Sequence, residues 1–189
     1  MVFSRFLSRA FLLLSTAAVS APIATAPFRS VRLTNGGLVI VRHGASQSVE
    51  VIAGKPRIAV AADGRLTIDN RDSPHEPRAT IAVTTPALDS FSVDNGGKLV
   101  LDQGFPAQAA LNAHVDNGGM LDLRRLAAAR VNASVEQGGI VLVRADQSLD
   151  ARISQGGNVT YWGDAAVKSM VNGGGAVARG RPEDMGDPL

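Results

Sequence analysis

The most regular feature of the chain is an alternation of apolar and polar residues, interrupted at intervals by short glycine turns. Val93 precedes one such turn, and Leu99 and Leu101 follow it. Val115 and Leu121 stand in the same relation to the next turn. A period of two places successive side chains on opposite faces of a β-strand. The pattern therefore predicts pairs of short strands joined by glycine turns.

The turn has the form Asn/Gln-Gly-Gly and occurs six times. From Gly96 onward the first glycines of successive turns lie between 17 and 22 residues apart. Glycine adopts positive φ at little cost because it has no Cβ, and a neighbouring amide can hydrogen-bond to nearby backbone. The predicted structural turn glycines are Gly36, Gly37, Gly96, Gly97, Gly118, Gly119, Gly138, Gly139, Gly156, Gly157, Gly173, Gly174 and Gly175.

Two all-β architectures could use such turns. One is a meander of hairpins with type I′ turns, and the other is a solenoid in which each repeat forms one rung stacked on the last. Stacking would bring the amides of the repeats into one ladder and so explains why the same residue types recur. We therefore favour a β-solenoid resembling a parallel β-helix, with rungs of about 17–22 residues. The predicted amide ladder comprises Asn95, Asn117, Gln137, Gln155 and Asn172.

The two ends of the repeat region differ from its centre. Residues 28–85 show the same alternation with looser spacing, so we expect further rungs there. A polar run at 69–78 contains Pro74 and Pro77 and is predicted to be a surface loop. Residues 179–189 contain charge, proline and glycine without periodicity and are expected to be a disordered tail.

Residues 1–26 have the pattern of a signal peptide. Arg5 and Arg9 precede an apolar run over residues 10–19, and small residues follow at 24–26. The run is shorter than the roughly 20 apolar residues that a membrane-spanning helix needs. We therefore expect export, with cleavage after Ser20 or Ala26, and no transmembrane span in the mature chain.

Charge and cysteine content narrow the function classes. Loss of Arg5 and Arg9 from the 19 basic residues leaves 17, which equals the number of acidic residues. A neutral mature chain lacks the electrostatic footprint of a nucleic-acid-binding protein, so no nucleic-acid partner is expected. The chain contains no cysteine, which excludes disulfides and thiolate metal sites.

The chain contains, in order, an opening strand at 28–33, a strand at 38–41, a turn and strand at 62–68, a segment at 81–88, the glycine turns, a segment at 159–165 and a closing repeat at 167–177. In their kind and order these segments resemble the GIN domain family, which is described as the head domain of auto-transporter adhesins. The resemblance implies a right-handed parallel β-helix-like fold, an envelope or surface location in bacteria and no known catalytic residues. This chain has Asn/Gln-Gly-Gly where the family usually has Gly-Ser-Gly. The resemblance covers residues 28–178.

No reactive constellation stands out in the sequence. His43, His75 and His114 have no metal-ligand spacing and are expected at the surface. The string 173–178 matches Gly-x-Gly-x-x-Ala, but no βαβ unit surrounds it. Phosphate-loop and nucleophile-elbow motifs are absent from the sequence. We therefore assign no catalytic, cofactor-binding or metal-binding residue and predict no cofactor.

Two patterns invite a functional interpretation. Asp94, Asp116 and Glu136 each precede a turn amide and should stack, which could suit Ca²⁺, but Ser154 and Val171 at the same position would break the ladder. Solvated carboxylates are the favoured interpretation. The adjacent rings of residues 161 and 162, Tyr and Trp, could form a binding platform, but a core or end-cap role is favoured, with one ring inward and the other exposed.

The sequence thus predicts an exported, non-enzymatic β-solenoid of the bacterial cell envelope with an adhesin-like or envelope-organising role. Its partner would be a cell-surface polysaccharide or an envelope protein. One alternative is a carbohydrate-binding or polysaccharide-cleaving β-helix, which would need carboxylates with Arg or Lys in an exposed groove. Another is a self-assembling scaffold, because solenoid ends are exposed sheet edges. The ligand, the oligomeric state and the choice among periplasm, outer membrane surface and secretion stay open.

Overall fold

The computed structural model describes residues 22–23, 25–71 and 78–185. Their regular structure is all β apart from one 3₁₀ helix, η1 (Pro182–Met185), which confirms the predicted class. The strands are β1 (Ser30–Thr34), β2 (Leu38–His43), β3 (Ser48–Ala53), β4 (Arg57–Val60), β5 (Arg65–Asp69), β6 (Thr80–Thr85), β7 (Ser90–Asp94), β8 (Lys98–Leu101), β9 (Gln108–Asp116), β10 (Met120–Glu136), β11 (Ile140–Ser154), β12 (Asn158–Trp162), β13 (Ala166–Asn172) and β14 (Ala176–Arg179).

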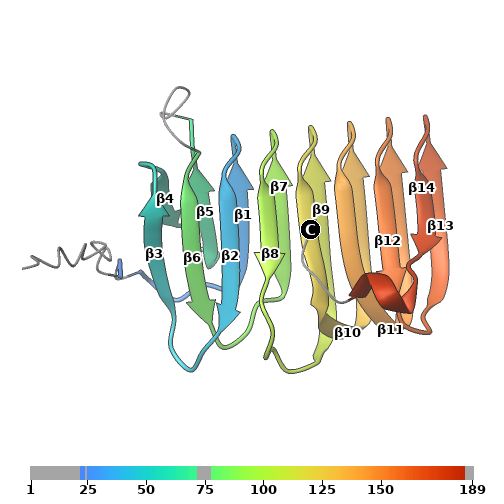
Figure 1. Ribbon diagram of the computed structural model, residues 1–189, viewed down its shortest axis with the longest axis horizontal. Helices are drawn as coiled ribbons and strands as arrows, with labels where there is room; N and C mark the ends of the chain where they lie inside the picture. Colours follow the sequence, from blue (N-terminus) through green and yellow to red (C-terminus); the bar gives the residue numbers. More distant parts are fainter. Residues whose placement is uncertain (1–21, 24, 72–77, 186–189) are drawn as a thin grey trace, which may run out of the picture.

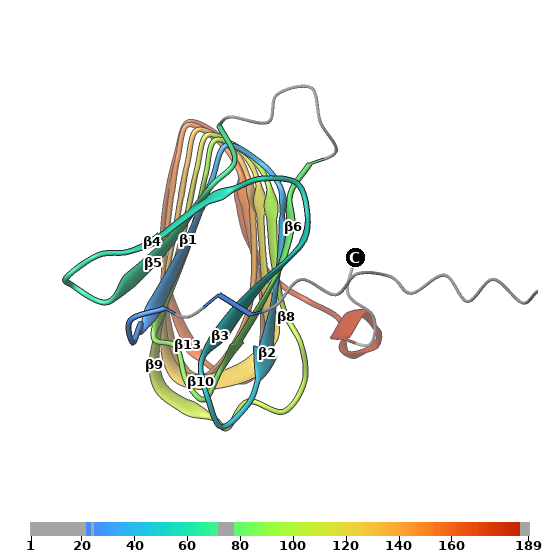
Figure 2. The same cartoon turned by 90° about the vertical axis from the view of Figure 1, so that its left-hand side faces the viewer.

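The strands belong to one sheet that curls into two facing walls (Figure 2). The first wall contains β5, β1, β7, β9 and β13, and the second contains β6, β2, β8, β12 and β14. The long strands β10 and β11 run through the lower corner and contribute to both walls (Figure 1). Register shifts between Leu123 and Arg130 mark the bend.

Parallel pairing stacks equivalent positions of successive repeats in register. On the first wall Val93 pairs with Val115, which pairs with Val135 and then Ile153. All four side chains are at most 1% exposed. The alternation seen in the sequence therefore becomes apolar columns between the walls and polar columns outside them. Because the pairs between glycine-turn repeats are parallel, a hairpin meander does not describe this part of the chain.

The N-terminal end departs from this order, which makes the sheet mixed. β3 pairs antiparallel with β6, and β4 pairs antiparallel with β5. A tight turn at Ala61–Gly64 joins β4 to β5, and such a short connection permits only antiparallel strands. The expectation that residues 28–85 simply add rungs is therefore wrong for β3 and β4. These strands close the N-terminal end of the coil (Figure 1).

The C-terminal tail also differs from the expectation. Instead of being disordered from residue 179, the chain folds back over the outside of the second wall (Figure 1). The Gly180 N–H donates to the Tyr161 carbonyl at 2.8 Å, and η1 follows. The tail packs there because the indole of Trp162 lies on the outer face and offers apolar surface. Residues 186–189 lie outside the described part.

Two other sequence predictions fall largely outside the described residues. For the predicted signal peptide, residues 1–21 and 24 lie outside the described part. For the predicted surface loop, residues 72–77, which include His75, lie outside it. In the described part, no helix has the length and apolar character needed to cross a membrane.

Candidate functional site

The glycine turns stack in a row along the upper edge of the coil (Figure 1). Every predicted turn glycine has a positive φ, between 80° and 116°. The Asn or Gln before each of the first five turns is also left-handed, with φ between 52° and 61°. Asparagine tolerates this region better than most residues with a Cβ. Every one of these turns therefore depends on left-handed backbone conformations, as the sequence predicted.

In the first five turns the second glycine meets a further constraint, whereas in the last turn the third glycine, Gly175, meets it. A Cβ on Gly119 would lie 2.6 Å from Cγ1 of Val93 and 3.1 Å from the carbonyl oxygen of Gly97. A Cβ on Gly118 would meet nothing within 4 Å. The first glycine therefore serves the turn alone, whereas the second also allows successive rungs to approach closely.

The amide ladder forms over fewer residues than predicted. Asn35 donates to Asp69 at 2.7 Å, Asn95 to Asn35 at 3.4 Å and Asn117 to Asn95 at 3.1 Å. Gln137 and Gln155 occupy the equivalent backbone position in the next two turns. Asn172 does not, because it pairs in register with Ser154 and Gly173 follows it. Including Asn172 was wrong, since the extra glycine of the last turn shifts the alignment by one residue.

The three predicted carboxylates do share one column. Asp94 pairs with Asp116, and Asp116 with Glu136. Ser154 continues the column as predicted, but Asn172 rather than Val171 comes next. No group of three His, Asp or Glu side chains within the described ranges could hold a metal ion.

Asp94 instead belongs to a polar hollow of about 340 Å³ on the outside of the first wall. Arg32 forms an ion pair with Asp94, whose side chain is 10% exposed. A second ion pair, between Arg65 and Asp63 at 3.1 Å, also lines the hollow. The lining residues are Ser30, Val31, Arg32, Asp63, Arg65, Ser90, Ser92, Asp94 and His114. Hydroxyls and ion-paired charges of both signs thus converge on one exposed surface.

His114 connects the hollow to the next rung. Its Nδ1 lies 2.7 Å from Oγ of Ser134, and its Nε2 lies 3.9 Å from Oδ1 of Asp94. The sequence placed His114 at the surface but did not reveal these neighbours, because they lie about twenty residues away on either side. His43 is exposed as well and stacks edge-on against Phe105 with ring centroids 5.3 Å apart.

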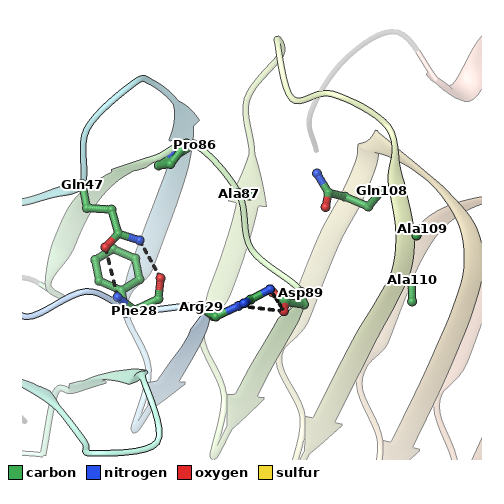
Figure 3. A pocket seen from close by; sticks show the side chains of 9 residues that line it. All are labelled: Phe28, Arg29, Gln47, Pro86, Ala87, Asp89, Gln108, Ala109 and Ala110. Atoms are coloured by element: carbon green, nitrogen blue, oxygen red, sulfur yellow. Dashed lines mark hydrogen bonds and ion pairs between the residues drawn. The ribbon is translucent and has the colours of Figure 1, made fainter.

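A second hollow, of about 470 Å³, lies at the lower corner between β9 and the segment before β7 (Figure 3). The Gln47 amide bonds the backbone N–H and carbonyl of Phe28, which fixes one side of the hollow. An exposed ion pair between Arg29 and Asp89, at 2.9 Å, also lines the hollow (Figure 3). The rest of the lining is largely aliphatic, so this hollow offers fewer polar groups than the one at Asp94.

The aromatic pair does not form an exposed platform. Tyr161 is partly buried against the core, and Trp162 is only 5% exposed although it points outward. The indole N–H donates to the Arg181 carbonyl at 2.8 Å, and the Arg124 guanidinium lies 5.3 Å from the ring centroid. The expectation of one exposed ring is wrong, because the C-terminal tail covers it.

Residues 107–165 match the family model described as "Putative auto-transporter adhesin, head GIN domain". This range is shorter than the 28–178 suggested by the sequence motifs. A comparison with curated proteins finds no match.

The chain also resembles several solved structures. A putative adhesin from Bacteroides fragilis has 17% identity and a TM-score of 0.47, over 84% of this chain and 95% of that one. A putative adhesin from Parabacteroides merdae has 14% identity and a TM-score of 0.34, over 85% and 95%. A protein from Parabacteroides distasonis, titled a putative lipid binding protein, has 12% identity and a TM-score of 0.35, over 85% and 96%.

Similarities at this level are too low to transfer a function. The family match is independent of them and lies in the region of β9 to β12, where the repeats are most regular. The resemblance of this chain to the GIN domain family is therefore confirmed over residues 107–165.

Proposed function

We propose that the chain is an exported, non-enzymatic module of the bacterial cell envelope with an adhesin-like role, built as a right-handed parallel β-helix-like solenoid. The parallel register of the repeats supports this architecture, and the signal-peptide pattern supports export. The family match supports the adhesin-like role.

The observation that carries the proposal is the polar outer face of the first wall. Its columns run unbroken across the repeats, for example from Ser90 through Asn112 and Asn132 to Asp150. The Asn132 amide donates to Asn112 at 3.1 Å, which orders the face. A flat, ordered array of amides, hydroxyls and charges suits repeated hydrogen bonds to an extended polymer.

We place the main ligand contacts at the hollow around Arg32 and Asp94. Sugar rings present neighbouring hydroxyls that donate and accept hydrogen bonds. An Arg–Asp pair with nearby serines offers both the acceptors and the donors that these hydroxyls need. The ligand class is accordingly a cell-surface polysaccharide.

Binding of the purified chain, from Ala21 onward, to insoluble peptidoglycan and to a panel of envelope polysaccharides tests this function. We expect saturable binding that Ser92→Trp abolishes by filling the hollow. Ser148→Trp, on the same wall but away from the hollow, is the matched control and should bind normally. Loss of binding in both variants would point away from the hollow, and no binding by the wild-type chain to any surface would count against adhesion.

Polysaccharide cleavage is the second candidate, because Asp63 and Asp94 meet Arg32 and Arg65 in the same exposed hollow. Paired carboxylates are the usual acid and base of glycoside hydrolysis. Both are held in ion pairs here, which favours a binding role. Release of reducing ends from an acidic polysaccharide, lost in Asp63→Asn, would establish cleavage instead.

A further inference from the structure

The C-terminal end of the coil is an open sheet edge. Within the described residues β13 pairs only with β11, and β14 only with β12. All seven residues of β13 are exposed. Three of them are large and apolar, and they are Val167 at 40%, Met170 at 56% and Val171 at 41% exposure.

Two of these residues occupy core positions that lack a covering layer. Val171 continues the column of Val135 and Ile153, and Val167 pairs with Leu149, which is 1% exposed. In every earlier rung the next strand covers the equivalent side chain. The end of the coil therefore presents core surface and unpaired backbone groups together.

The opposite end carries features that discourage edge pairing. β3 has a register shift between Val51 and Ala53, and Lys55 and Pro56 follow it directly. Bulges, lysine and proline are the usual protections of an exposed strand. β13 has an uninterrupted register against β11, and Lys168 is its only charged residue.

No other segment in the described part of the chain covers this edge. After Arg179 it turns back, so that Arg181 contacts Trp162 on β12 and Asp184 contacts Arg124 on β10. At the other terminus Ile23 bridges to Val49 on β3, at the far end of the coil.

We propose that a second copy of this chain covers the edge through a two-fold axis, with β13 pairing antiparallel to β13 of the second copy. Full overlap of the seven residues places Ser169 opposite Ser169 of the second copy. Val167 then faces Val171 of the second copy, so both core positions gain an apolar neighbour. Lys168, the only charged residue of β13, faces Met170 of the second copy, so no like charges lie directly opposite each other. A two-fold contact covers the open C-terminal end of each copy, so assembly stops at a dimer.

Sedimentation velocity of the chain from Ala21 onward tests the dimer, because this form retains Ile23. We expect twice the monomer mass for the wild type and a monomer for Val171→Lys. Ile52→Lys is the matched control, since Ile52 is 53% exposed at the protected end and should leave the dimer intact. Circular dichroism establishes that each variant keeps its strands. A monomeric wild type, an open-ended polymer, or dissociation caused by Ile52→Lys would overturn the proposal.

The absence of cysteine from the sequence permits a sharper test of the register. Directly opposed residues of antiparallel strands have Cα atoms about 4.5–5.5 Å apart, which a disulfide can bridge. Ser169→Cys should therefore oxidise to a covalent dimer, whereas Lys168→Cys, which is diagonal to its copy, should cross-link far more slowly. A dimer in which Ser169→Cys fails to cross-link would overturn this arrangement.

Discussion

Arg124 makes a two-point ion pair with Asp122, with Nε 2.9 Å from Oδ1 and Nη2 2.7 Å from Oδ2. Both side chains are only 4% exposed on the outside of the second wall, where the C-terminal tail covers them. Donation of these hydrogen bonds to the Asp122 carboxylate raises the pKa of Arg124. A buried pair of this kind costs most when one partner is removed.

Arg124→Met should therefore destabilise the fold by about 3–5 kcal/mol, because it leaves the Asp122 carboxylate buried and unpaired. Arg124→Met combined with Asp122→Leu should recover much of that loss. Arg152→Met provides the control, since Arg152 is 59% exposed in its pair with Asp150 and its loss should change stability by less than about 1 kcal/mol. Urea unfolding measures all three, and equal losses in Arg124→Met and Arg152→Met would contradict the burial argument.

Tail docking can be followed through Trp162, the only tryptophan in the chain. Truncation after Arg179 removes the carbonyl that accepts the indole N–H and exposes the ring. We expect a red-shifted emission and stronger quenching by acrylamide, with the strand signal in circular dichroism retained. Gly180→Val should act similarly, because a Cβ at residue 180 would overlap the indole. Unchanged emission in both variants would show that the tail does not cover the ring in solution.

The two glycines of one turn should differ in their tolerance of alanine. Gly118→Ala meets open space and carries only the cost of a left-handed backbone, about 1 kcal/mol. Gly119→Ala should cost roughly 2–4 kcal/mol, because its Cβ also collides with Val93 and the Gly97 carbonyl. Thermal or urea unfolding of the two variants gives the comparison. The prediction fails if both variants lose the same stability.

Asp69 should contribute to stability in a pH-dependent way. Burial acts to raise the pKa of Asp69, but hydrogen bonds from the Asn35 amide and the Arg71 backbone N–H outweigh it and lower the pKa below its usual value. The stabilisation is therefore full above the unfolded pKa, about 3.9, and is lost as the pH falls through the lower folded pKa. Asn35→Gly should raise the folded pKa toward the unfolded value and so make that loss of stability smaller, whereas Asn117→Gly should leave it unchanged. Unfolding free energies between about pH 2 and 6 test this difference.

The notable errors of sequence interpretation concern the ends of the coil. Asn172 looked like a member of the amide ladder because it precedes glycines, but the third glycine of its turn moves the alignment by one residue. The tail at 179–185 lacks periodicity, yet it packs on Trp162. No local sequence pattern predicts that contact, because the two segments meet only once β12 is in place.

The hollow at Asp94 could not be predicted from the sequence either. Arg32 and Asp94 lie 62 residues apart, and only the pairing of β1 with β7 brings them together. The carboxylate column over Asp94, Asp116 and Glu136 could be predicted, since it follows directly from the repeat.

By itself the sequence determined the all-β class, the two-residue alternation and the position of each turn, because these depend on φ preferences and hydrophobic period within a few residues. The tertiary structure alone decided which strands run antiparallel at the N-terminal end, where the tail packs, and why β13 remains an open edge. These outcomes depend on the free energies of contacts between segments that are distant in the sequence, and no single segment determines them.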